Sequence, residues 1–167
     1  KDGTAYLACS FGIIELNTEK KEIANTFYLN TNSNLGVNDL SFSGDSIYAA
    51  TDLGLFSANL NDNLLDYQSW QIQVENYAIE RIEQAYNNLY FITDSKQKIY
   101  SYSPQGLDSV VEVDNLKFIK SNEGRLFVGA QSRLLELQEN NTLTTIKESS
   151  YLYRISDVIK DNDVYWA

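Results

Sequence analysis

The side chains that most often perform catalysis are missing from this sequence. It contains no His, one Cys and no Met among its 167 residues. Without His, neither a Ser-His-Asp triad nor a Cys-His pair can form, and a His-ligated metal is excluded. A single Cys also excludes an internal disulfide. What remains is carboxylate catalysis, acid–base chemistry by Lys or Tyr, a Ca²⁺ site built from oxygens, or binding without reaction.

Two carboxylate pairs and one acidic triplet are the candidates for that chemistry. Asp62 with Asp66, or Glu80 with Glu83, could hydrolyse glycosides, which requires two acids about 5–10 Å apart across a cleft. The first pair lies in an expected loop and the second on an expected strand, so neither pattern marks a catalytic site. The triplet Asp161-Asn162-Asp163 resembles the start of a Ca²⁺ loop, but no later bidentate carboxylate follows and the triplet fits a hairpin turn. We therefore expect no enzyme, no metal and no cofactor.

Aromatic side chains are better candidates for a binding surface. Tyr67 and Trp70 lie on an expected outer strand, where they could stack on sugars or contact another protein. Packing between neighbouring sheets is the alternative for both. Arg125 and Arg133 flank another expected strand and are predicted to be solvated charges. Cys9 stands where recurring segments of the chain have Thr or Ala, which predicts a small packing residue and not a nucleophile.

Charge and hydropathy restrict the partners. Twenty-three Asp and Glu residues against thirteen Lys and Arg residues give a net charge of −10 and an isoelectric point near 4.4. This charge disfavours nucleic acid and anionic membranes as partners. The apolar fraction of 43% is sufficient for a packed core, and no apolar run reaches the roughly 18 residues of a membrane span. The chain begins without Met or a signal peptide, so we expect a piece of a longer protein that does not itself span the membrane.

The elements that position these residues follow from a repeat. Short apolar segments recur five times around the aromatic residues Tyr6, Tyr48, Tyr90, Phe127 and Tyr165. Their spacing is close to the period of about 40 to 50 residues found in four-stranded propeller blades. The pairs Gly44-Asp45, Asn87-Asn88 and Glu123-Gly124 precede these residues and predict tight hairpins, as do Gly12 and Gly54 six residues after theirs. A more polar outer strand ends each unit, at 26–29, 67–73, 110–114 and 144–148.

The predicted fold is therefore all-β: an arc of a β-propeller made of four-stranded antiparallel blades. We expect a single propeller fragment over residues 1–167, with three complete blades and two partial ones. The expected ranges are 1–29 (partial blade), 37–73, 79–114 and 116–148 (complete blades) and 155–167 (partial blade). A closed four-bladed ring would need the chain to stop near Lys160, so we expect part of a larger ring. Both ends would then expose unpaired strands, which predicts poor solubility or self-assembly of this segment alone.

Several segments resemble known propeller repeats. Residues 37–59 (VNDLSFSGDSIYAATDLGLFSAN), and 155–157 with 163–167, are similar to the two-component-regulator propeller repeat of Bacteroidetes proteins. The run 5–29 (AYLACSFGIIELNTEKKEIANTFYL), followed by 47–59 and 63–71, resembles the N-terminal propeller of PorZ-like proteins of the type IX secretion system. This likeness covers roughly the first 70 residues.

The resemblance implies an extracytoplasmic protein in the periplasm or at the cell surface, at the outer membrane, with a ring of about seven blades. It implies a non-catalytic partner of the sortase-like protein that attaches cargo to anionic lipopolysaccharide, with that glycan as a second candidate ligand. No family motif for the glycan site can be placed on particular residues, and the charge of −10 suits an anionic glycan poorly. Two alternatives remain: the periplasmic ligand-sensing propeller of a hybrid two-component regulator, and, disfavoured by the missing catalytic groups, a propeller lyase or glycosidase.

Overall fold

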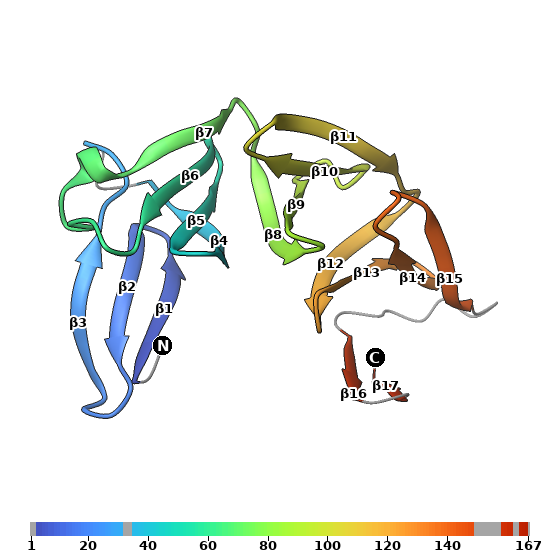
Figure 1. Cartoon of the computed structure of the whole chain (residues 1–167), viewed down its shortest axis with the longest axis horizontal. Coiled ribbons are helices and arrows are strands. Elements are labelled where there is room, and N and C mark those ends of the chain that lie inside the picture. The colour runs from blue at the N-terminus through green and yellow to red at the C-terminus, as the bar shows by residue number, and fades with distance from the viewer. Residues whose placement is uncertain (1–2, 32–34, 149–157, 162–163, 167) are drawn as a thin grey trace. The chain divides into compact units, whose positions relative to one another are not determined.

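The computed structural model describes residues 3–31, 35–148, 158–161 and 164–166. Its regular structure consists of β-strands and one short 3₁₀ turn at Tyr67–Ser69 (Figure 1). The prediction of an all-β fold is confirmed.

The described strands form five antiparallel sheets, each made of strands that are consecutive in the chain. The first sheet has three strands: β1 (Thr4–Cys9), β2 (Gly12–Asn17) and β3 (Glu22–Phe27). The second contains β4 (Val37–Ser43), β5 (Ser46–Thr51), β6 (Gly54–Asn59) and β7 (Gln71–Glu75). The third contains β8 (Ile79–Ala85), β9 (Asn88–Thr93), β10 (Lys98–Ser103) and β11 (Gly106–Glu112). The fourth contains β12 (Leu116–Asn122), β13 (Arg125–Ala130), β14 (Arg133–Leu137) and β15 (Leu143–Glu148). The last has two strands: β16 (Ile159–Asp161) and β17 (Val164–Trp166).

Three complete and two partial four-stranded blades are thus confirmed. The chain divides into two compact units, Lys1–Glu80 (unit 1) and Arg81–Ala167 (unit 2). Membership of a single, about seven-bladed ring stays a prediction, as do the expected domain boundaries.

The core of unit 1 lies between its two sheets. Ile13 and Phe27 of the first sheet belong to one buried cluster with Ile47, Ala49 and Phe56 of the second. Residues next to Ala49 and Phe56 on the same strands are buried as well, so both faces of β5 and β6 are covered. The burial explains why short apolar segments recur along the sequence.

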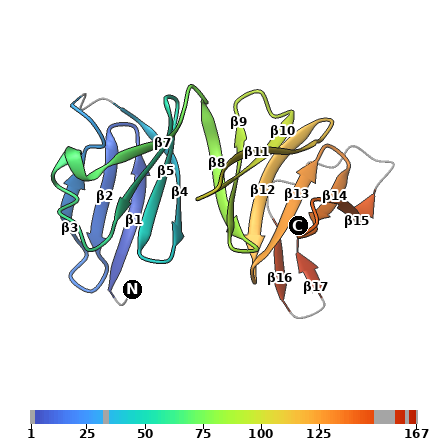
Figure 2. The same cartoon turned by 45° about the horizontal axis from the view of Figure 1, so that its top comes forward.

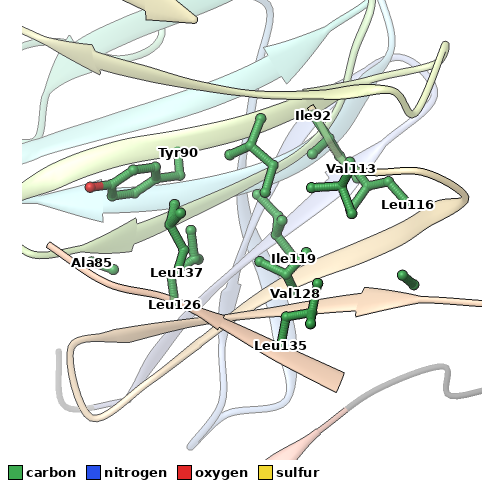
Figure 3. Close-up of a cluster of buried hydrophobic side chains, with 12 residues drawn as sticks. Ala85, Tyr90, Ile92, Val113, Leu116, Ile119, Leu126, Val128, Leu135 and Leu137 are labelled. Carbon is green, nitrogen blue, oxygen red and sulfur yellow. The ribbon is translucent and has the colours of Figure 1, made fainter. Parts of the chain in front are cut away.

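Unit 2 has an equivalent core (Figure 3). Tyr90 and Ile92 of β9 pack in one cluster with Leu126 and Val128 of β13 and with Leu137 of β14. Each of these five side chains is buried. The predicted aromatic position at Tyr90 is therefore a core position.

Of the three hairpin turns predicted before the recurring aromatic residues, two are confirmed. Gly44-Asp45 joins β4 to β5, and Glu123-Gly124 joins β12 to β13. The third prediction is wrong by one residue, because β8 ends at Ala85 and β9 already begins at Asn88. Tyr86 and Asn87 occupy the turn, with φ of 47° and 62°. Asn tolerates this left-handed conformation better than Tyr does, and for that reason the sequence favoured Asn-Asn.

The outer strands also differ from the prediction. The segment 67–73 is not one strand: a 3₁₀ turn precedes β7, which begins only at Gln71. Asp66 is the reason, since its side chain accepts a hydrogen bond from the backbone N–H of Gln68 and so caps the turn. The outer strands β3 and β11 lie a few residues earlier in the chain than expected, at Glu22–Phe27 and Gly106–Glu112.

Candidate interaction surfaces

Trp70 is a core residue of unit 1. It follows the 3₁₀ turn, is only 6% exposed, and belongs to the cluster that contains Phe27 and Leu64. Its indole Nε1 donates a 3.1 Å hydrogen bond to the carbonyl oxygen of Leu64. The ring of Trp70 is therefore covered by neighbouring side chains. It is not exposed for stacking on a ligand.

Tyr67 lies in the same loop but is exposed. Its side chain is 43% accessible, and Leu65 beside it is also exposed. Asp66 caps the turn, and Ser69 Oγ donates to the carbonyl oxygen of Asn63 at 2.9 Å. These bonds hold the loop that presents the tyrosine. A partner contact at this surface stays a prediction, and Tyr67 is the residue that could make it.

Comparing the Trp70→Phe and Tyr67→Ala variants distinguishes a buried core residue from an exposed surface residue. Phenylalanine keeps most of the buried ring but has no N–H for the Leu64 carbonyl, so we expect a loss of about 1 kcal/mol in the free energy of unfolding. The Tyr67→Ala variant should change that free energy by less than about 0.5 kcal/mol, because it removes an exposed ring. Urea unfolding of both variants measures these values. A larger loss for Tyr67→Ala than for Trp70→Phe would contradict the assignment.

A hollow of about 600 Å³ lies in unit 1 between the start of β1 and the β4–β5 hairpin. Tyr6 and Phe42 line it, with ring centroids 5.7 Å apart and planes tilted by 51°. Burial, and then the charge of Glu15, raise the pKa of Tyr6, so its phenol keeps its proton at neutral pH. The remaining lining residues are Thr4, Ala5, Gly44, Leu60 and Asn61. The sequence identified Tyr6 as a repeat position but gave no sign of this hollow.

Asp66 and Glu83, one member of each candidate carboxylate pair, have structural partners. Asp62 is exposed in a turn, and Asp66 is engaged in capping. Glu83 accepts a 2.7 Å hydrogen bond from Ser121 Oγ and forms an ion pair with Lys120 Nζ at 3.4 Å. These bonds tie β8 to β12 and serve the packing of unit 2.

The described parts of the acidic triplet and Cys9 both lie at strand ends. No group of three or more His, Cys, Asp or Glu that could hold a metal occurs among the described residues. In the acidic triplet, Asp161 ends β16 and pairs with Val164 of β17, and residues 162–163 lie outside the described residues. Cys9 is half-buried at the end of β1, opposite Gly12.

An ion pair that the sequence did not predict lies inside unit 2. Arg125 Nε donates to Glu136 Oε1 at 2.5 Å, and Nη2 of the same guanidinium contacts Oε2. Glu136 is only 5% exposed, and the guanidinium lies 5.5 Å from the ring centre of Phe127. The prediction of a solvated Arg125 is therefore wrong. Arg133, the second predicted solvated charge, is half-buried.

Tyr86 completes this arrangement. Its hydroxyl lies 3.5 Å from Glu136 Oε1, and burial, followed by the charge of Glu136, raises the tyrosine's pKa. Arg125 thus binds both carboxylate oxygens of Glu136 through its Nε and Nη2 groups, and Tyr86 lies beside one of these oxygens. The one sequence signal was Glu136 itself, an acid within the apolar strand Leu134–Leu137 that requires a partner when buried.

Residues 1–71 resemble a known family of propeller domains. They match the model of the type IX secretion PorZ N-terminal β-propeller domain. The resemblance predicted from the sequence is thereby confirmed over this segment, which comprises most of unit 1 and less than half of the chain. No curated protein matches the sequence.

Solved structures show the same fold. PorZ of Porphyromonas gingivalis, a bacterial surface component of the type IX secretion system, matches 93% of the chain with a TM-score of 0.69 and 18% identity. The extracellular domains of a one-component and a hybrid two-component system from B. thetaiotaomicron match 97% and 99% of the chain, with 14% and 16% identity and TM-scores of 0.69. The chain spans 20% of PorZ and 24% and 25% of the other two. At these identities the likeness establishes the propeller-type fold.

The first of these proteins is a bacterial surface component, and the other two structures are extracellular domains. Among the described residues, no helix has the length and apolarity that a bilayer crossing requires.

Proposed function

We propose that this chain is a non-catalytic interaction domain of a PorZ-like protein of type IX secretion. The match of residues 1–71 to the PorZ N-terminal propeller carries the proposal. The protein would act outside the cytoplasm, in the periplasm or at the cell surface. Its partners would be proteins of the attachment complex, including a sortase-like component that joins cargo to the surface.

The geometry supports binding and not reaction. Asp66 and Glu83, two of the acids singled out in the sequence, are engaged in capping and packing, and Arg125 and Glu136 bind each other. Tight hairpins join many of the strands, and hydrogen bonds within the loop between β6 and β7 hold the segment that exposes Tyr67. Loops on a rigid β scaffold commonly carry recognition in proteins.

Surface glycan is a second candidate ligand of the complete protein. Lipopolysaccharide is anionic, and the charge of residues 1–80 opposes it. This segment contains eleven acids and three bases, whereas residues 81–167 contain twelve acids and ten bases. We therefore place glycan contacts outside unit 1.

The alternative function is the ligand-sensing propeller of a hybrid two-component regulator. The structural likeness to such an extracellular domain, with a TM-score of 0.69, favours it. A kinase domain after a transmembrane helix in the complete protein would establish the sensor. A second propeller without a kinase would establish the secretion component.

Deletion of the gene in its own bacterium tests the proposal. We expect secreted cargo to appear unattached in the medium, since the attachment complex lacks a partner, and expect reattachment when the gene is restored. Immunoblots of cell and medium fractions measure the distribution. Normal attachment, combined with loss of a transcriptional response to an oligosaccharide, would replace the proposal with the sensor function.

A further inference from the structure

Exposed large apolar side chains are concentrated in one half of the chain. Within the described residues, all of them belong to unit 1. Phe11, Tyr28 and Leu53 are 40%, 43% and 53% exposed. Each lies in a connection between strands.

These three connections lie at the same end of the two sheets of unit 1. Cys9 pairs with Gly12 where β1 turns into β2, and Thr51 pairs with Gly54 where β5 turns into β6. Tyr28 follows the end of β3, at the level where Ile13 pairs with Phe27. In Figure 2 the β1–β2 turn and the end of β5 lie at the upper edge of unit 1, opposite the N-terminus.

Close contacts join the connections into one surface. A Cβ at Gly12 would lie 3.6 Å from Cδ1 of Tyr28, so the tyrosine ring lies against the turn that carries Phe11. A Cβ at Gly36, just before β4, would lie 3.3 Å from the carbonyl oxygen of Ser10. We call Phe11, Tyr28 and Leu53, together with Asp52 and Glu75, the turn surface.

The Leu53 turn is held rigidly. Thr51 Oγ1 accepts hydrogen bonds from the backbone N–H groups of Leu53 (3.2 Å) and Gly54 (3.1 Å) and donates to the carbonyl oxygen of Gly54 at 2.8 Å. Beside it, Asn38 Nδ2 donates to Asp52 Oδ1 at 2.8 Å. An exposed apolar side chain on a fixed turn loses little conformational entropy when a partner covers it. This turn is therefore suited to be an anchor for a partner.

The charge around these residues has one sign. Asp52 and Glu75 are both exposed at this end of unit 1. The described cations of unit 1 are Lys20 and Lys21, which lie in the β2–β3 turn at the opposite end. Unit 1 as a whole carries a net charge of −8 out of the −10 of the chain. A partner of the turn surface must therefore combine apolar side chains with positive charge.

We propose that the turn surface docks a protein segment in which Lys or Arg residues flank aromatic or aliphatic side chains. The proposal rests on the proposed function and specifies the chemistry of the protein partner. Phe11 and Leu53 supply the apolar anchors, Tyr28 extends the contact, and the two acids select the basic partner. A second copy of this chain and an anionic glycan both carry the wrong charge for this surface.

Binding of three synthetic peptides to the full chain tests the proposal. The first alternates Lys with Phe, the second has Glu in place of Lys, and the third has Ser in place of Phe; fluorescence anisotropy measures each affinity. We expect the Lys/Phe peptide to bind more tightly than both others. Phe11→Ser and Leu53→Ser should each weaken that binding by about tenfold, since central anchors carry most of the affinity of an interface.

Leu65→Ser is the matched control, because Leu65 is an exposed apolar residue of the same unit, 61% accessible, but lies outside the turn surface. This variant should bind the Lys/Phe peptide as the wild type does. Circular dichroism of every variant confirms that the fold is retained. Equal binding of the Glu/Phe peptide, an equal loss with Leu65→Ser, or no binding of the Lys/Phe peptide would overturn the proposal.

Self-association is measured on the same samples. A dimer in sedimentation that Leu53→Ser dissolves would overturn the proposal in favour of a second copy. The peptide assay needs no secretion partner, so its failure would leave the cargo-attachment function standing. Conversely, normal cargo attachment in the deletion strain would refute the proposed function. The peptide assay would still test whether the turn surface binds a basic, apolar segment.

Discussion

Gly54→Ala is expected to remove a large share of the stability of the domain. Gly54 has a φ of 143°, and a Cβ at this position would lie 1.9 Å from the carbonyl oxygen of Val74 on β7. The obstacle is backbone within the same sheet, so the β6–β7 pairing would have to separate. Strain at such a φ and disruption of the sheet together predict a loss of about 4 kcal/mol or more. That loss is a large share of the roughly 5–15 kcal/mol that stabilises a typical domain.

Gly106→Ala is the control for this effect. Gly106 has nearly the same φ, 135°, but no heavy atom lies within 4 Å of the Cβ that alanine would add. Its cost is then backbone strain alone, about 1–3 kcal/mol. Urea unfolding followed by Trp fluorescence and circular dichroism gives both values. If the two variants lost equal stability, the contact with the Val74 carbonyl would not be the cause.

The same contact recurs at the first repeat. A Cβ at Gly12 would lie 2.3 Å from the carbonyl oxygen of Phe27, and Gly12 also has a positive φ, of 138°. In the first two sheets, β2 and β6 therefore begin where the outer strand passes too closely for a side chain. This geometry explains why glycine follows Tyr6 and Tyr48 at the same distance, and why the spacing of the repeats predicted the hairpins.

The architecture was predictable because each blade repeats one pattern of burial. Aromatic or aliphatic residues that return about every 40 positions require the same sheet to form again, and the turn residues that separate the short segments favour strands over helices. The positions of the outer strands were less predictable. A single capped turn at Asp66 shifts the start of β7 to Gln71, and such local side-chain bonds are not visible in a pattern of apolar residues.

The sites were harder to predict than the fold. Trp70 and Tyr67 are neighbours in sequence with the same aromatic character, yet one is buried and the other exposed. Phe11 and Leu53 have side chains of the types that usually form cores. They are exposed because they lie in turns, and residue type does not reveal where a turn lies. Sequence alone establishes which positions are apolar, whereas contacts across strands decide which of them are covered.

The ion pair of Arg125 and Glu136 is likewise set by contacts across strands that the sequence does not reveal. Its disruption is the second change for which we expect a large loss of stability. In the register of the sheet, Phe127 pairs with Glu136, which brings the acid next to the strand that carries Arg125. Arg125→Ala would leave the carboxylate of Glu136, which is 5% exposed, without its charged partner. Removing one partner of a buried pair costs about 3–5 kcal/mol, and we expect a loss near the lower value because the arginine side chain is 33% exposed.

Lys98 and Glu112 provide the matched control, since their ion pair has a good distance of 2.8 Å but lies at the surface, with side chains 40% and 74% exposed. Lys98→Ala should cost less than about 1 kcal/mol. The double variant Arg125→Ala/Glu136→Ala should be more stable than Arg125→Ala alone, because it removes the unpaired buried charge together with its partner. Urea unfolding of the single and double variants yields the coupling energy. If Arg125→Ala cost no more than Lys98→Ala, the guanidinium would not compensate the buried carboxylate, and the pair would be no more than a surface contact.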